Sequence, residues 1–246
     1  MKGLNKGLGI WQILNSNIVT DIIAASGFDF TILDLEHGLH TPQTIQNCIH
    51  SAKASSISTI VRLPNDYYPY IVQIIDTGVD SIIFPHVETE DQLQKIIDQT
   101  FIYPTGSKSY SPFVPRFKYS EDHNKDFDLN PYLGILIESN LGIKNADKLL
   151  KNHNVDFIYF GAYDLSVEYE KPGKIFEKDI LEKLNYLIKI SHKYNKKIMS
   201  IYRNEDELEI LIKMGVNFPV ASVDTSQLIK KLKKEVKNYN KFKSTS

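Results

Sequence analysis

The chain has 246 residues, of which 42% are hydrophobic and 24% are charged, and its formal net charge at pH 7 is −1. This length and composition are ordinary for a globular protein with a substantial core. The near-zero net charge provides no general attraction to nucleic acid or to an anionic membrane, and no apolar run approaches the ~20 residues that span a bilayer.

The cysteine content and the first residues point to a cytoplasmic protein. A single cysteine, Cys48, excludes an intrachain disulfide and any multi-cysteine metal site. It lies in the apolar-periodic segment TIQNCIHSA, which favours a packed thiol over a nucleophile. The opening MKGLNKGLGIWQ lacks the continuous apolar core of a signal peptide.

Short β-rich runs alternate with helical patterns along the chain. The predicted strands cover residues 8–14, 30–36, 58–63, 81–87, 133–139, 156–162, 197–202 and 218–224. Segments with helical periodicity cover residues 17–27, 41–54, 67–78, 89–100, 142–152, 177–195, 205–215 and 225–239. Several of these helices start at a capping residue, and Gly27, Gly78 and Gly215 end three of them.

Eight strands, each followed by a helix, predict a (β/α)8 TIM barrel that forms a single domain over residues 1–246. The near-continuous apolar strands suit a parallel sheet that is covered on its outer face. A doubly wound open sheet is the alternative on pattern alone, although no Gly-x-Gly-x-x-Gly fingerprint and no P-loop follow the first strand. The connection at about 102–130 is long enough to be a lid, a binding loop or a segment that reaches a neighbouring subunit.

Polar residues gather where the predicted strands end, and active sites of such barrels lie at that end. These residues are Asp34, Glu36, His37, Arg62, His86, Glu138, Asp164 and Asp224. Asp76 lies near the end of a helix and approaches the barrel mouth only through its loop.

Each of these residues has a functional and a structural interpretation. Glu138 and Asp164 form a plausible cradle for Mg²⁺ or Mn²⁺, which prefer oxygen ligands; the alternative is that each carboxylate caps the following helix. His37, oriented by a carboxylate, makes a credible general base, or else a histidine satisfied by local hydrogen bonds. Arg62 suits an oxyanion, or else a structural ion pair with Asp34 or Glu36.

Two further observations narrow the chemistry. His86, in FPHVETED, is interpreted as a polar residue at a strand end in preference to a metal ligand. No predicted strand carries a lysine near its catalytic end, since Lys196 and Lys197 start strand seven. Schiff-base catalysis needs such a lysine, so carbon–carbon chemistry here would have to stabilise an enolate with a metal.

Seven motifs, in order, resemble the class II metal-dependent pyruvate aldolases, the 4-hydroxy-2-oxoheptanedioate and 2-keto-3-deoxy sugar-acid aldolase family. They are GFDFTILDLEHG, VRLPND, IIDTGVDSIIFPHVETED, YPTGS, IESNLGIKN, FGAYDLS and ASVDTSQL, and the similarity runs from about Gly9 to Leu228. The resemblance implies a typically hexameric barrel that reversibly cleaves a 4-hydroxy-2-oxo acid into pyruvate and an aldehyde through a metal-stabilised enolate.

The resemblance also implies roles for individual residues. Glu138 and Asp164 would hold a divalent cation (Mg²⁺, Mn²⁺ or Co²⁺) that chelates pyruvate. His37 would be the base, with Asp76 raising its basicity, and Arg62 would stabilise the enolate oxygen. The partners would be small 2-oxo acids and aldehydes, together with further copies of the chain, and neither nucleic acid nor membrane.

Three positions depart from the family pattern. The backbone at Tyr163 and Asp164 would receive the pyruvate carboxylate, but the family's usual Gly-Pro-x-Asp is GAYD here, which places bulky Tyr163 beside the carboxylate site. Leu136 replaces a substrate-contacting glutamine and cannot donate its hydrogen bond. Lys108 replaces an arginine and loses bidentate anion recognition.

These departures leave two alternatives beside the aldolase. One is another enolate-forming lyase or hydrolase on the same barrel, resembling the acyl-CoA lyases or a decarboxylase. The other is a non-catalytic binding barrel. The sequence names neither the aldehyde nor the physiological direction.

Overall fold

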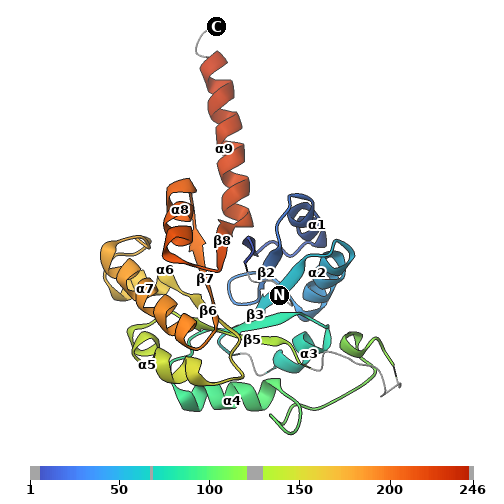
Figure 1. The fold of residues 1–246 in the computed structure, drawn as a ribbon. Helices are drawn as coiled ribbons and strands as arrows, with labels where there is room; N and C mark the ends of the chain where they lie inside the picture. The colour runs from blue at the N-terminus through green and yellow to red at the C-terminus, as the bar shows by residue number, and fades with distance from the viewer. Residues whose placement is uncertain (1–5, 67–68, 121–129, 244–246) are drawn as a thin grey trace.

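All eight predicted strands form and close into one parallel barrel in the computed structural model (Figure 1). The structure describes residues 6–66, 69–120 and 130–243. The strand order follows the chain, and β1 pairs with both β2 and β8, so the open doubly wound sheet is excluded. The strands are β1 (Gly9–Gln12), β2 (Phe30–Asp34), β3 (Ser58–Arg62), β4 (Ser81–Phe84), β5 (Tyr132–Ile137), β6 (Phe157–Phe160), β7 (Lys197–Tyr202) and β8 (Phe218–Val223).

Helices cover the outside of the barrel, and the predicted helical segments are confirmed. They are α1 (Asn17–Ala25), α2 (Pro42–Ala54), α3 (Ile71–Asp76), α4 (Glu90–Thr100), α5 (Asn140–Lys151), α7 (Lys178–Lys193), α8 (Glu205–Met214) and α9 (Asp224–Lys243). Two short elements were not predicted: the 3₁₀ turn η1 (Pro115–Phe117) and α6 (Ala162–Glu168). The first two residues of the predicted helix 67–78 lie outside the described residues.

Local sequence explains where several helices begin. The side chains of Thr41, Thr89, Ser139 and Asn204 each accept the backbone N–H three residues ahead, at the starts of α2, α4, α5 and α8. Each bond satisfies one of the four N–H groups that lack a partner in a first helical turn. Gly215 ends α8 with φ of 96°, a left-handed conformation that glycine adopts without steric cost.

The strands are buried on both faces. All five residues of β2 and all four of β4 and β6 are buried, which agrees with their uninterrupted apolar runs. Inward side chains fill the barrel, and outward ones pack against the helix layer to form the hydrophobic core.

The described part of the long connection packs against the barrel. Phe117 is buried, and Arg116 donates to the carbonyl oxygens of Ile75 at 2.7 Å and Val79 at 2.5 Å. These contacts attach η1 to the end of α3 and the start of β4. Residues 121–129 of this connection lie outside the described residues.

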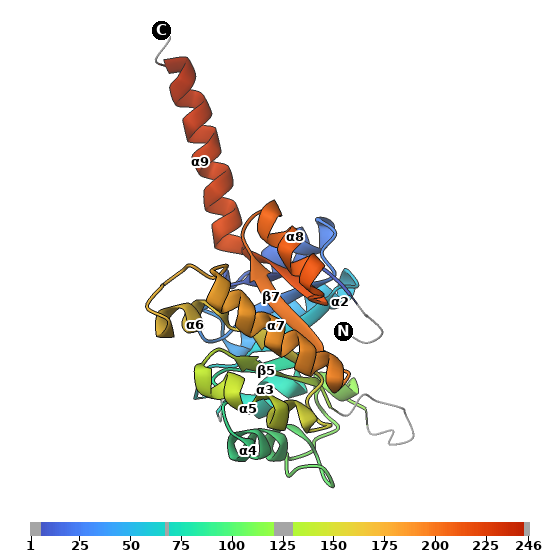
Figure 2. The ribbon, with the colours of Figure 1, turned by 60° about the vertical axis from the view of Figure 1, so that its left-hand side comes forward.

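The last helix behaves differently from the others. α9 leaves the barrel beside α8 and projects away from it (Figures 1 and 2). Its large apolar side chains are 48–75% exposed: Leu228, Ile229, Leu232, Val236, Tyr239 and Phe242. Across the described ranges, no helix combines the length and apolar character needed to cross a membrane.

Candidate active site

A cavity of about 250 Å³ opens at the carboxyl ends of the strands. Seven of the eight strands, or the residues that follow them, contribute to its wall. The lining residues are Trp11, Ile13, Asp34, His37, Arg62, Leu136, Glu138, Tyr159, Gly161, Ala162, Tyr163, Asp164, Ile201 and Val223. The structure therefore brings together the predicted residues His37, Arg62, Leu136, Glu138, Tyr163 and Asp164.

The register between β2 and β3 places a fixed cation in this cavity. Asp34 lies opposite Arg62, whose Nε and Nη2 donate to the two carboxylate oxygens of Asp34 at 2.9 and 2.5 Å. Glu36 accepts from Nη1 at 3.0 Å, and the guanidinium lies 4.5 Å from the ring centre of Trp11. Burial opposes the charge of Arg62, but these carboxylates offset it and raise its pKa. The ion pair that was the structural alternative for Arg62 is confirmed, and the paired Arg62 also lines the cavity.

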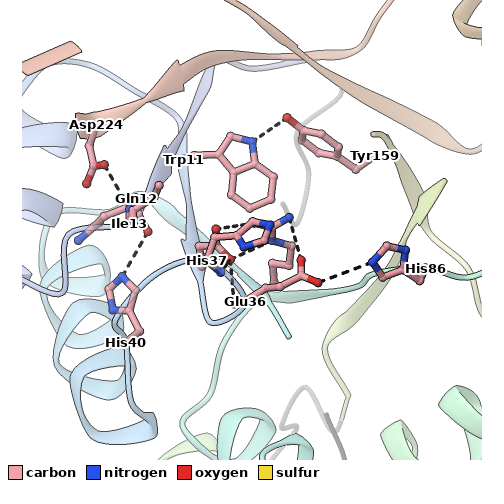
Figure 3. Close-up of polar contacts among 11 residues, drawn as sticks. Trp11, Gln12, Ile13, Glu36, His37, His40, His86, Tyr159 and Asp224 are labelled. Atoms are coloured by element: carbon pink, nitrogen blue, oxygen red, sulfur yellow. Dashed lines mark hydrogen bonds and ion pairs between the residues drawn. The ribbon is translucent and has the colours of Figure 1, made fainter. Parts of the chain in front are cut away.

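Asp34 also shapes the loop that carries His37. Its Oδ1 accepts the backbone N–H of Glu36 at 3.0 Å and that of His37 at 3.3 Å, which turns the chain just after β2. One buried carboxylate thus orients both Arg62 and the loop. His37 itself lines the cavity. Figure 3 shows its side chain among the neighbouring polar residues.

An aromatic pair forms part of the cavity lining. Trp11 donates from Nε1 to the hydroxyl of Tyr159 at 2.7 Å, and the two rings meet edge to face at 5.1 Å (Figure 3). Burial raises the pKa of Tyr159, so its hydroxyl stays protonated. Sequence reasoning missed this pair because an inward aromatic on a barrel strand has the pattern of ordinary core.

Glu138 is a buried carboxylate with a second acid beside it. Its Oε1 accepts the backbone N–H of His86 at 2.9 Å and lies 3.1 Å from His86 Nδ1. Burial raises the pKa of Glu138 to about 8; the His86 bond opposes this rise, and Asp164 adds to it. Gly161 permits the arrangement, because a Cβ there would lie 2.2 Å from the Cβ of Glu138.

Two placements refine the sequence predictions. Asp164 lies in the first turn of α6 and not on β6, and it still reaches the cavity because α6 follows that strand after one residue. His86 follows β4 with φ of 52°, and its Nε2 lies 3.9 Å from Glu36 Oε1 (Figure 3). Its contact with Glu138 places His86 at the rim, as its predicted position at a strand end indicated.

Two other predicted residues are not among those that line the cavity. Asp76 is the last residue of α3, which runs back from the barrel mouth, and its carboxylate accepts from buried Lys108 Nζ at 2.8 Å. This placement gives no support within one chain to the prediction that Asp76 assists His37. Asp224 starts α9 and accepts the backbone N–H groups of Ile13 and Leu14 at 3.2 and 3.0 Å, which fixes the loop after β1.

The charge balance of the cavity fits a divalent cation. Asp34, Glu138 and Asp164 face a single lining arginine, Arg62, which leaves an excess of two negative charges when all are ionised. Hard divalent cations take such carboxylates and complete their shell with water or substrate oxygens. Within the described residues, no three histidines, cysteines or acids are grouped as a complete metal site. Glu138 and Asp164 would therefore be a two-carboxylate cradle.

The fold and the site together define a (β/α)8 barrel with an acidic cavity at the carboxyl ends of its strands. The chain belongs to the HpcH/HpaI aldolase/citrate lyase family, whose model matches residues 8–231. It is 25% identical over 219 residues to 5-keto-4-deoxy-D-glucarate aldolase from Salmonella gallinarum, covering 88% of this chain and 86% of that protein.

Solved structures share the barrel. The citrate synthase SbnG superposes with a TM-score of 0.85 at 21% identity, covering 98% of this chain and 95% of that one. The protein CitE from Mycobacterium tuberculosis, in complex with magnesium and pyruvate, gives a TM-score of 0.60 at 14% identity, covering 90% and 87%. These neighbours show the shared fold.

Proposed function

We propose that the protein is a class II, divalent-metal-dependent aldolase that reversibly cleaves a 4-hydroxy-2-oxo acid into pyruvate and an aldehyde. The observation that carries the proposal is the pair of buried Glu138 and exposed Asp164, which lines the same cavity as the fixed cation Arg62 and the imidazole of His37. Family membership and the distant likeness to a keto-deoxy sugar-acid aldolase support it.

In this proposal, four lining residues carry the chemistry. Glu138 and Asp164 would hold Mg²⁺, Mn²⁺ or Co²⁺; when bound, the cation supplies Lewis-acid stabilisation of negative charge on the oxo acid. In the condensation direction His37 takes a proton from the methyl group of pyruvate. Arg62, held by Asp34, stabilises the enolate oxygen without having to reorganise.

The remaining site residues bind the substrate. The backbone N–H groups of Tyr163 and Asp164, in the first turn of α6, would receive the pyruvate carboxylate. Leu136 would contact substrate only through apolar surface. Asp76 remains a predicted partner of His37, a role that requires another subunit to bring it to the barrel mouth.

The direct test follows pyruvate release from a panel of 4-hydroxy-2-oxo acids. Activity should be lost on dialysis against a chelator and return with Mn²⁺, Mg²⁺ or Co²⁺. His37→Ala should lower kcat by about 10²–10⁴-fold, the usual contribution of a general base. The matched control is His50→Ala on the exposed side of α2. Full activity in His37→Ala would refute the base assignment.

A second candidate is an enolate-forming decarboxylase or acyl-CoA lyase. Leu136 motivates it, since this 2%-exposed side chain faces the cavity without a hydrogen-bonding group for a substrate hydroxyl. Oxaloacetate and acyl-CoA esters in the same panel separate the two: faster turnover of either than of every hydroxy-oxo acid favours this candidate. A protein that binds no divalent ion and shows no thermal shift with pyruvate would favour a non-catalytic barrel.

We also propose that the protein is a homo-oligomer, with a hexamer as the family-based expectation, and that it acts in the cytoplasm. Exposed apolar side chains lie on α9, and Ile18 and Ile22 of α1 are 64% and 59% exposed. A second copy of the chain would cover both surfaces. Leu232→Glu with Val236→Glu should lower the mass measured by light scattering, whereas Lys234→Glu with Lys237→Glu, on the other side of α9, should not.

A further inference from the structure

The cavity lining combines polar and aliphatic side chains. Arg62, Glu138 and Asp164 are among the polar ones. Four aliphatic residues lie at the ends of β1, β5, β7 and β8: Ile13, Leu136, Ile201 and Val223. We call these four residues the aliphatic wall.

The aliphatic wall is held in place by the barrel. Leu136 and Ile201 are 2% and 5% exposed and lie within strands. Ile13 follows β1, and its backbone N–H is bound by Asp224 at 3.2 Å, a contact visible in Figure 3. The wall therefore presents a preformed apolar surface. An apolar group of a ligand binds there favourably because its surface is removed from water.

The charged side chains that a single chain contributes to the cavity disfavour a second anion. With Asp34, Glu138 and Asp164 ionised against Arg62, a bound divalent cation brings the lining to neutrality and the pyruvate carboxylate makes the complex negative. Arg62 is already paired with two carboxylates. Arg203, just after β7, is paired with Glu207 and donates to a carbonyl oxygen, so it too is engaged.

We propose that the aldehyde handled by this site is uncharged and carries an apolar substituent that packs on the aliphatic wall. This inference rests on the proposed aldolase function and names its second substrate class. In condensation, a methyl proton of pyruvate passes to His37, and the freed electron pair forms the carbon–carbon bond to the aldehyde carbonyl carbon. The carbonyl π pair moves to oxygen, which takes up a proton; cleavage is the reverse.

The first experiment separates the inference from the function on which it rests. With Mn²⁺ present, exchange of the pyruvate methyl protons in D₂O, followed by NMR, reports enolate formation without any aldehyde. Condensation is then compared for 4-methylpentanal and 4-oxobutanoate, which match in shape but differ in charge. We expect at least tenfold higher kcat/KM for 4-methylpentanal, the scale of one or two favourable methylene contacts.

A pair of variants tests whether the substituent of the aldehyde packs on the aliphatic wall. Val223→Lys places a cation on the aliphatic wall and should shift the kcat/KM ratio of the two aldehydes about tenfold toward 4-oxobutanoate. Val167→Lys, at an exposed position of α6 outside the cavity, is the matched control and should leave the ratio unchanged. Circular dichroism checks that both variants fold. If Val223→Lys does not fold, the comparison of the two aldehydes with the wild-type protein still tests the inference.

The outcomes are distinct. Methyl exchange with a preference for 4-oxobutanoate, or with no preference, overturns the inference and leaves the aldolase proposal intact. Absence of exchange in the presence of Mn²⁺ refutes the proposed function and the inference with it. An equal shift in both lysine variants removes the aliphatic wall as the determinant.

Discussion

Replacing Glu138 by glutamine should stabilise the metal-free protein at alkaline pH. Burial raises the pKa of Glu138 from 4.5 to about 8, so the folded state holds a proton that the unfolded state has already released. Since the folded state binds more protons between these values, stability falls as pH rises from about 4.5 to about 8. Below about 4.5 both states are protonated and this cost is absent.

The size of the effect follows from the shift. At pH 7 the gap of about 2.5 pH units above the unfolded pKa costs roughly 3 kcal/mol, and near pH 8 the cost approaches roughly 5 kcal/mol as an upper bound. Glutamine keeps an oxygen to accept the His86 backbone N–H but carries no charge. Glu138→Gln should therefore equal wild type near pH 5 and exceed it by a few kcal/mol near pH 8.

The assay is urea unfolding in excess chelator at several pH values. Trp11 is the only tryptophan and lies in the cavity wall, so its fluorescence reports the barrel directly. Other groups titrate in both proteins, so their contributions cancel in the difference between the two free energies of unfolding. Parallel stability curves for wild type and Glu138→Gln across this pH range would refute the assigned pKa. Added Mn²⁺ should stabilise wild type increasingly as pH rises, because binding replaces the proton.

Three further predictions concern groups around the cavity. Arg62→Lys loses the bidentate contact with Asp34, and kcat/KM for aldol cleavage should fall about 10²-fold, measured by steady-state kinetics. Gly161→Ala adds a Cβ that must displace Glu138, and Mn²⁺ affinity by calorimetry should fall about tenfold with little change in global fold by circular dichroism. Asp224→Ala leaves two backbone N–H groups after β1 unpaired and should cost about 1–3 kcal/mol in urea unfolding.

The architecture was predictable because each strand–helix unit carries its own periodicity. Eight such units in one chain leave few parallel arrangements, and strands buried on both faces require a covering layer of helices. The capped helix starts at Thr41, Thr89, Ser139 and Asn204 were equally local signals. The short α6 was missed because seven residues give too little periodicity to distinguish a helix from a loop.

The site was predictable only where position after a strand implies position at the mouth. That rule placed Arg62 and Glu138 correctly in one cavity. It did not determine which side chains pair. Asp34 accepts two hydrogen bonds from Arg62 because the β2–β3 register places them opposite each other, and Glu138 accepts the backbone N–H of His86 from the neighbouring strand end. Such pairing depends on three-dimensional geometry that periodicity does not encode. Asp76 shows the converse, because a motif resemblance assigned it a role that its position at the end of α3 does not support within one chain.

The exposed apolar side of α9 shows the limit of what an amphipathic pattern predicts. The apolar residues of α9 recur at spacings that put them along one side of the helix, so the pattern predicts that this side is covered. It does not say whether the cover is the same barrel or another chain. The structure exposes Leu228, Leu232 and Val236 by 51%, 51% and 60%, so the chain's own barrel leaves them largely uncovered. A further copy of the same chain would cover this side without a second kind of molecule.

The chemistry of the cavity separates what defines the reaction from what selects the substrate. In the proposed reaction, Glu138, Asp164, His37 and Arg62 would act on the part of the substrate that is common to all 2-oxo acids, and they would set the ability to form an enolate. The cavity lining also includes Leu136 and Ile201, which would offer the electrophile apolar surface without a hydrogen-bonding group. Under the proposed aldolase function, the choice of aldehyde therefore depends more on the aliphatic wall than on the carboxylates that motif reasoning finds first.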